Sequence, residues 1–238
     1  MIFSETGNVK CPTIILLHGG GLSDWSLKEV ADRLSTKYNV VTPIIDGHGE
    51  DGEEEFISIE DSASKVISYI CSKHGGKVFA IGGLSIGAQI ACEVLSQQNS
   101  IAEYAIIESA LVCPIKETAD LTIPTYKLFY GLIKKRWFSK MQAKVLCVPN
   151  ELFEKYYQDS LNISMKSLIN ITLSNGNYTL KQSIANTTAK VLVIVGEKEI
   201  SVMKKSAELL HKSIRGSKIF IAKKMKHGEL SMSYPEIY

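Results

Sequence analysis

The chain alternates short apolar runs with longer amphipathic stretches, and this alternation restricts its fold more than any other feature. The runs are rich in Ile and Val and end at glycines or polar turns; they are Ile14–Leu17, Val40–Ile45, Val78–Ile81, Tyr104–Ile107, Val191–Val195 and Lys218–Ile221. Such runs are typical of strands that are buried on both faces. Apolar residues recur at helical spacing in Asp24–Thr36, Ile59–Lys73, Ile86–Gln97 and Val202–Ile214. The alternation predicts an α/β fold, with a mostly parallel central sheet and helices on both faces. An edge hairpin is expected over Ile2–Val9.

One long segment interrupts this alternation. The stretch from Cys113 to about Lys190 is too long for a simple crossover and contains several helical patterns of its own. We expect a single domain over residues 1–238, with a helical lid at about 113–190 inserted between core strands. Many of the chain's aromatic residues lie in this lid. Most such rings pack cores, but some are expected to line a pocket, and the candidates for substrate binding are Tyr130, Trp137 and Phe138.

The composition limits which binding partners and which cellular compartment the chain suits. A formal net charge of +2 provides no strong field for nucleic acid or an anionic membrane, so we expect a small-molecule substrate and no stable membrane association. The five cysteines are widely spaced and odd in number, which favours reduced thiols over a disulfide framework or a zinc cluster. Residues 1–10 lack the pattern of a signal peptide, and no apolar run approaches the roughly 20 residues of a membrane span. A cytoplasmic protein is therefore expected.

The first motif with chemical meaning is Gly83-Leu84-Ser85-Ile86-Gly87, which fits Gly-x-Ser-x-Gly. A predicted strand leads into it and a predicted helix leads out, and this geometry exposes a serine hydroxyl above a sheet. The glycines are needed because side chains in so tight a turn would collide. Ser85 is the predicted nucleophile. The Ile86 N–H, at the start of the helix, is a predicted donor to negative charge that develops in the reaction.

A second glycine-rich segment, His18-Gly19-Gly20-Gly21, follows the strand Ile14–Leu17. Glycines allow a backbone N–H to approach a substrate oxygen, so Gly20 is the predicted second oxyanion donor, with Gly21 as the alternative. A phosphate-binding loop is less consistent with the sequence, because no Gly-x-Gly-x-x-Gly pattern opens the helix and no Gly-Lys-Ser/Thr follows.

A serine nucleophile needs a base, and histidine is suited to this role near neutral pH. His227 lies in a loop after the last predicted strand. The other four histidines suit structural or surface roles: His18 and His48 lie in glycine-rich turns, and His74 and His211 lie on or near helices.

The base in turn needs a carboxylate to orient it. Glu199 follows the strand Val191–Val195, and the order Ser85, Glu199, His227 agrees with the order of serine, acid and histidine in hydrolases with this motif. Glu108, at the end of another strand, and Glu197 remain as alternative acids.

Together these features resemble the α/β-hydrolase superfamily, and specifically its small single-domain esterase and lipase-like members with an inserted lid. The resemblance rests on the His18-Gly19 loop, the Asp46-Gly47-His48-Gly49 turn, the Ser85 motif, the lid, the Gly196–Glu199 turn and His227. One departure is that family members usually carry Asp where this chain has Glu199, whose extra methylene requires the backbone to lie further back. Some members take the acid from the position of Glu108.

The resemblance implies a serine hydrolase that needs no metal or organic cofactor. The best-matching activity is a carboxylesterase for small or medium acyl esters, acting through an acyl-enzyme. Thioesterase, acyltransferase, lactonase and monoacylglycerol hydrolase reactions stay open because the same fold performs them, as does a non-hydrolytic ligand-binding role. Lys134, Lys135 and Arg136 could attract a CoA phosphate, although a solvated basic face explains them more simply. The oligomeric state stays open.

Overall fold

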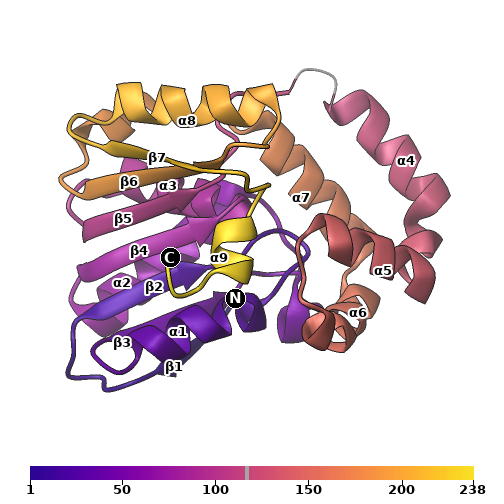
Figure 1. The fold of residues 1–238 in the computed structure, drawn as a ribbon, viewed down its shortest axis with the longest axis horizontal. Coiled ribbons are helices and arrows are strands. Elements are labelled where there is room, and N and C mark those ends of the chain that lie inside the picture. The colour runs from indigo at the N-terminus through magenta and orange to yellow at the C-terminus, as the bar shows by residue number, and fades with distance from the viewer. Residues whose placement is uncertain (116–117) are drawn as a thin grey trace.

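A computed structural model of the protein describes residues 1–115 and 118–238, and its centre is a seven-stranded sheet (Figure 1). The strand order is β1-β3-β2-β4-β5-β6-β7. Only β1 is antiparallel to its neighbour, β3, and all other neighbouring pairs are parallel. The strands are β1 (Ile2–Thr6), β2 (Thr13–Leu17), β3 (Asn39–Ile44), β4 (Val78–Leu84), β5 (Ala102–Glu108), β6 (Lys190–Gly196) and β7 (Lys218–Ala222).

All six predicted apolar runs are therefore strands of one sheet. The expected edge hairpin at residues 2–9 is wrong, because only its first arm is a strand. β1 pairs with β3, and the chain then turns at Asn8, whose carbonyl accepts a hydrogen bond from the Cys11 N–H, and leads directly into β2.

Helices cover both faces of the sheet, as the alternation predicts. They are α1 (Lys28–Leu34), α2 (Ile59–His74), α3 (Ile86–Gln97), α8 (Ser201–Ser213) and α9 (Glu229–Ser233), with short 3-10 turns η1 (Asp24–Leu27), η2 (Gly49–Asp51), η3 (Asn150–Leu152) and η4 (Gln182–Asn186). Alternate β2 side chains divide between the faces. Ile15 and Leu17 pack in the large core with α2, α3 and α8, whereas Ile14 and Leu16 pack against α1.

The lid consists of four helices between β5 and β6, inside the predicted segment 113–190. They are α4 (Thr118–Ile133), α5 (Arg136–Val145), α6 (Phe153–Asn162) and α7 (Met165–Asn177), and in Figure 1 they lie beside the sheet rather than on either of its faces. Within the described ranges, no helix is both long and apolar enough to cross a bilayer.

Hydrogen bonds fasten the lid to the body at separate points. On α6, the Asp159 carboxylate accepts a 2.7 Å bond from the Trp25 indole N–H. On α7, Asn170 donates its side-chain amide to the Phe56 carbonyl at 2.9 Å. The Gln89 amide, on α3, donates to the Asn175 carbonyl at 3.0 Å. The lid is therefore held over the ends of β2 and β4, where the predicted catalytic motifs lie.

Candidate active site

Ser85 lies between β4 and α3 in a backbone conformation that few non-glycine residues adopt, with φ 56° and ψ −115°. The flanking glycines make this turn sterically feasible. A β-carbon at Gly83 would lie 2.4 Å from the Gly87 carbonyl carbon, and one at Gly87 would lie 2.4 Å from the Leu17 carbonyl oxygen. The turn is fixed from the adjacent strand, because the Ser85 N–H donates a 2.9 Å hydrogen bond to the Glu108 carbonyl. The hydroxyl is thereby presented at the end of the sheet.

His227 is paired with Glu199. Its Nδ1 lies 2.7 Å from Oε2 of the carboxylate. The other carboxylate oxygen, Oε1, accepts hydrogen bonds from the Ser109 hydroxyl and the Gly196 N–H, each at 2.7 Å. Burial opposes ionisation of Glu199, but these hydrogen bonds outweigh it and hold its pKa below the ordinary value. A carboxylate that accepts from Nδ1–H leaves Nε2 of the imidazole as the basic nitrogen.

The His227 loop also packs directly against the serine turn. A β-carbon at Gly228 would lie 3.0 Å from the side chain of Leu84, the residue before Ser85. Ser85, Glu199 and His227 follow β4, β6 and β7, which run parallel, so all three residues lie at the carboxyl edge of the sheet. The structure therefore brings the predicted nucleophile, acid and base to the same edge of the sheet, with Glu199 and His227 in hydrogen-bond contact and the His227 loop beside the serine turn.

The two alternative acids occupy different environments. Glu108 is buried, its Oε1 accepts a 3.4 Å hydrogen bond from the Ser231 N–H, and its Oε2 has no partner among the described residues. Burial raises the pKa of Glu108 to about 7. Glu197 lies at the surface and accepts from the Lys224 N–H. Of the three carboxylates, only Glu199 has a hydrogen bond to His227 among the described contacts.

The two predicted oxyanion donors, Gly20 and Ile86, are neighbours in space. A β-carbon at Gly20 would lie 3.6 Å from the Ile86 side chain. Ile86 is the first residue of α3, so its N–H has no acceptor within the helix. Both residues line the same cavity as Ser85, and Gly21 lines it too. The positions suit a pair of N–H groups directed at an oxygen beside the serine.

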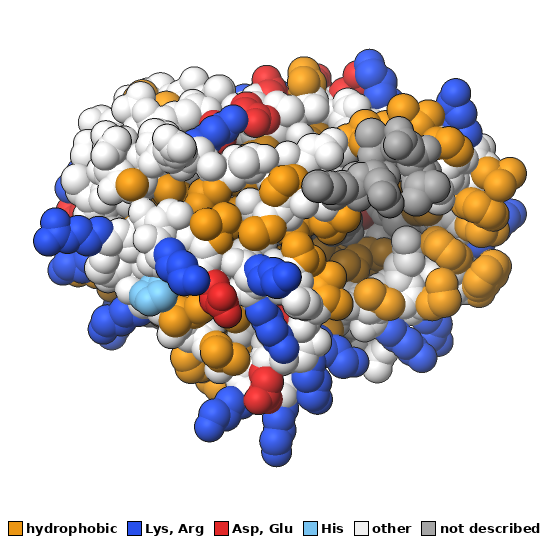
Figure 2. All heavy atoms as spheres, turned by 90° about the horizontal axis from the view of Figure 1, so that it is seen from above, with side chains coloured by type: hydrophobic (Ala, Val, Ile, Leu, Met, Phe, Trp, Pro, Cys, Tyr) orange, Lys and Arg blue, Asp and Glu red, His pale blue; other side chains and the backbone are white. Residues whose placement is uncertain are grey.

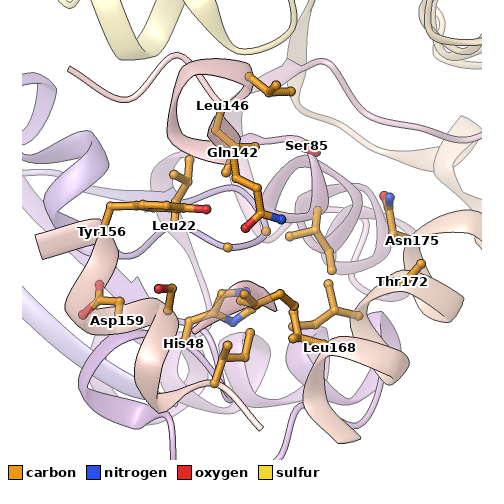
Figure 3. A pocket seen from close by; sticks show the side chains of 18 of the residues that line it. Leu22, His48, Ser85, Gln142, Leu146, Tyr156, Asp159, Leu168, Thr172 and Asn175 are labelled. Carbon is orange, nitrogen blue, oxygen red and sulfur yellow. The ribbon is translucent and has the colours of Figure 1, made fainter. Parts of the chain in front are cut away.

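This cavity has a volume of about 460 Å³ and lies between the body and the lid. Figure 3 shows Ser85, Tyr156, His48 and Leu168 around one space into which Gln142 points. Half of its lid-derived lining is aliphatic: Ile133, Met141, Val145, Leu146, Ile163, Leu168 and Ile171. The lid also contributes two tyrosines and several polar side chains, and Asp159 is the one charged side chain among the described residues that line the cavity. A partly open cavity of this size with a more apolar than polar lining suits a small ligand.

The predicted substrate-binding aromatics lie outside this lining. Trp137 is 64% exposed and packs edge-on against Phe138, and the Tyr130 hydroxyl donates a 2.7 Å hydrogen bond to the Ile163 carbonyl. Two other lid aromatics, Tyr126 and Tyr156, line the cavity together with aliphatic and polar lid residues, which agrees with the expectation that some lid rings would do so. The signal for part of this wall was helical spacing: Leu168, Thr172 and Asn175 repeat along one side of α7.

The two buried histidines, His18 and His48, make local hydrogen bonds with the backbone, and His48 also lines the cavity. His18 Nε2 accepts a 3.0 Å hydrogen bond from the Ile45 N–H, and burial lowers the pKa of His18 to about 3. His48 Nδ1 lies 3.0 Å from the Asp46 carbonyl oxygen, and burial lowers its pKa as well. The five cysteines are free, and no cluster of His, Cys, Asp and Glu suited to a metal is found among the described residues.

Comparison with known proteins places the chain in a family. The model of the family described as serine aminopeptidase, S33, matches residues 10–230. None of the curated proteins compared with the chain matches it. Among solved structures, a thermophilic esterase from Thermogutta terrifontis has a TM-score of 0.79 at 15% identity, over 99% of this chain and 89% of that one.

Two other solved structures agree in fold. An esterase from Exiguobacterium antarcticum has a TM-score of 0.78 at 17% identity, over 96% of this chain and 88% of its own. The enol-lactonase from Burkholderia xenovorans LB400 has a TM-score of 0.77 at 13% identity, over 96% and 90%. With the family model covering almost the whole sequence, the chain belongs to the serine aminopeptidase S33 family of the α/β-hydrolase superfamily.

Proposed function

We propose that the protein is a serine carboxylesterase that hydrolyses small or medium acyl esters. The observation that carries the proposal is the pairing of His227 with a buried, ionised Glu199 beside a strained serine turn. A buried carboxylate held by three donors stabilises the imidazolium that forms when the histidine accepts a proton. Nucleophilic catalysis requires this stabilisation of the charged histidine, whereas a protein that only binds a ligand does not.

In the proposed mechanism, His227 removes the proton from the Ser85 hydroxyl as its oxygen attacks the ester carbonyl. The tetrahedral oxyanion is bound by the Gly20 and Ile86 N–H groups. His227 then donates its proton to the departing alcohol, which leaves an acyl-enzyme on Ser85. Water, deprotonated by the same histidine, attacks the acyl group and restores the free serine. Every step uses groups of this chain, without a cofactor.

The cavity supports an ester with an apolar acyl part. Aliphatic side chains form half of its lid wall, and its volume of about 460 Å³ limits the length of chain that fits. Gln142 and Asn175 supply the amide groups of the lining and suit a polar alcohol portion. The free cysteines fit a reducing compartment, so we place the protein in the cytoplasm, without nucleic-acid partners and without stable membrane association.

The test is hydrolysis of p-nitrophenyl esters of increasing acyl length by the protein and its Ser85→Ala variant. The proposal predicts turnover that depends on Ser85 and is greatest at a short or medium chain. An acyl-CoA, a lactone and a monoacylglycerol are assayed beside the esters. Faster hydrolysis of one of these would reassign the substrate within the same chemistry. A single covalent event without turnover would indicate a binding protein.

A further inference from the structure

The outer surface of the lid carries a row of exposed apolar side chains. On α5, Trp137, Met141 and Val145 recur at every fourth position and are 64%, 51% and 73% exposed. On the adjacent α4, Leu128 and Phe129 are 73% and 49% exposed. We call these five residues the lid stripe. Water-exposed side chains of this size, grouped on two packed helices, are typical of an interaction surface.

The lid stripe reaches the entrance of the catalytic cavity. Met141 and Val145 are exposed to solvent and at the same time line the cavity that contains Ser85, so they form part of its rim. Figure 2 shows a face of the molecule on which hydrophobic side chains gather around a hollow, with Lys and Arg side chains along the edge. Whatever covers the lid stripe therefore lies directly over the route to the serine.

Basic residues accompany the lid stripe. The lid helices, residues 118–177, contain eight Lys and Arg but four Asp and Glu, a formal charge of +4. The whole chain carries +2, so the rest of the chain is at −2. Lys140 and Lys144 alternate with the apolar residues of α5, are exposed, and have no ion pair among the described residues. The small net charge of the chain therefore conceals a strongly basic lid.

We propose that the lid stripe docks reversibly on an anionic lipid surface, with the cavity entrance facing the lipid. A helix with Trp and aliphatic groups on one side and lysines beside them has the composition of helices that lie in a membrane interface. The lysines are attracted to anionic headgroups, and the apolar side chains enter the acyl boundary. Docking of this kind is weakened by salt, unlike the insertion of a spanning helix.

A second copy of the chain fits the lid stripe less well. Two lids facing each other would bring charges of +4 together, and like charges across an interface oppose association. An acidic protein would match the charge, but Leu128 and Trp137, which are 73% and 64% exposed, do not line the cavity and so offer no part of it to a partner side chain. Exposed apolar groups outside the cavity suit a fluid surface.

The experiment is co-flotation of the full chain with vesicles of phosphatidylcholine containing about a third phosphatidylglycerol, and with vesicles of phosphatidylcholine alone. We expect partitioning onto the anionic vesicles that falls as salt is raised. The chain has two tryptophans, of which Trp25 is buried, so a blue shift of emission on binding reports Trp137. Docking requires no turnover, so this result is independent of the proposed esterase activity.

Two double variants separate the apolar and the electrostatic contributions. Leu128→Ser with Trp137→Ser, and Lys140→Glu with Lys144→Glu, are each expected to weaken binding to anionic vesicles about tenfold or more. None of these four residues lines the cavity, so hydrolysis of a water-soluble p-nitrophenyl ester should persist. The matched controls, Val9→Ser and Lys204→Glu with Lys205→Glu, alter exposed residues of the body and should bind as the unchanged protein does.

Three results would overturn the proposal. The first is an unchanged protein that does not float with anionic vesicles. The second is equal loss of binding in the body controls, since the lid would then have no special role. The third is a concentration-dependent dimer that the Leu128→Ser, Trp137→Ser variant abolishes, in a protein that binds no vesicles. That result would show that the lid stripe binds a second copy of the chain.

Discussion

The serine turn and the lid are built by different means. In the turn, backbone atoms determine the geometry: the Gly83 and Gly87 positions leave no room for a β-carbon, and Glu108 holds Ser85 through its carbonyl. In the lid, side chains on four helices form the cavity wall, and many large apolar groups remain exposed. Substitutions in the turn should therefore affect whether the reaction occurs, and substitutions in the lid should affect which substrate reacts.

The largest expected effect comes from the acid beside the histidine. Glu199→Gln should lower kcat by a factor of about 10³ to 10⁴, because the neutral amide neither stabilises the imidazolium nor fixes the tautomer. Glu108→Gln is the matched control, since Glu108 is a buried carboxylate nearby without a hydrogen bond to His227. The measurement is kcat for one ester in both variants. A larger loss in Glu108→Gln would reverse the assignment of the acid.

A methyl group at Gly87, the second glycine of the serine turn, should lower activity nearly as much as Glu199→Gln does. In Gly87→Ala the β-carbon would meet the Leu17 and His18 carbonyl oxygens at 2.4 and 2.5 Å, so α3 must move away from β2. We expect activity to fall by about a hundredfold or more through displacement of the serine. Gly131→Ala, on α4 with open space around the new methyl, is the control. Comparable kcat values in the two variants would contradict the account of the turn.

A change in the lid should alter selectivity rather than chemistry. Leu168→Trp enlarges a side chain that lines the cavity, and should reduce kcat/KM for longer acyl esters about tenfold while sparing the acetate. Leu128→Trp, on the exposed side of α4, should leave the profile unchanged. The acyl-length profile measured with p-nitrophenyl esters distinguishes the two. A parallel loss for all chain lengths in Leu168→Trp would show that the lid affects the reaction itself.

The smallest effect concerns stability. Because the folded protein raises the pKa of Glu108 to about 7 from an ordinary 4.5, its neutral form stabilises the fold at low pH. That contribution is complete below pH 4.5 and is lost as the pH rises to 7, by up to about 3 kcal/mol. The free energy of unfolding, measured in urea, should decrease less between pH 5 and pH 8 in Glu108→Gln than in the unchanged protein. Glu199, whose pKa is lowered, contributes with the opposite sign at more acidic pH. Equal decreases would contradict the burial argument.

The same contrast between the serine turn and the lid explains which features could be predicted from the sequence. The strands could be predicted because buried parallel strands are continuous apolar runs, and Ser85 because a strained turn leaves glycines on both sides of it. The prediction of an edge hairpin was wrong because strand pairing depends on tertiary contacts, and β1 pairs with β3. The residues of the cavity wall were harder to predict, because aromatic content does not indicate which way a helix faces. Trp137 lies on the outside of α5, whereas Leu168 lines the cavity.

Whole-chain composition also concealed the uneven distribution of charge. A net charge of +2 predicted no strong field for anionic surfaces, but it is the sum of a lid at +4 and the remaining residues at −2. Only the division of the chain into body and lid makes the local value meaningful. The expected absence of a stable membrane association thus coexists with the proposed reversible docking.

The central claim is that Ser85 is a nucleophile activated by His227. The most direct measurement is covalent labelling by a fluorophosphonate, followed by mass spectrometry of the labelled peptide. We predict one label per chain, on Ser85, with none in Ser85→Ala and much slower labelling in His227→Gln, both variants being folded by circular dichroism. A label on another residue, or labelling that persists in folded Ser85→Ala, would contradict the account.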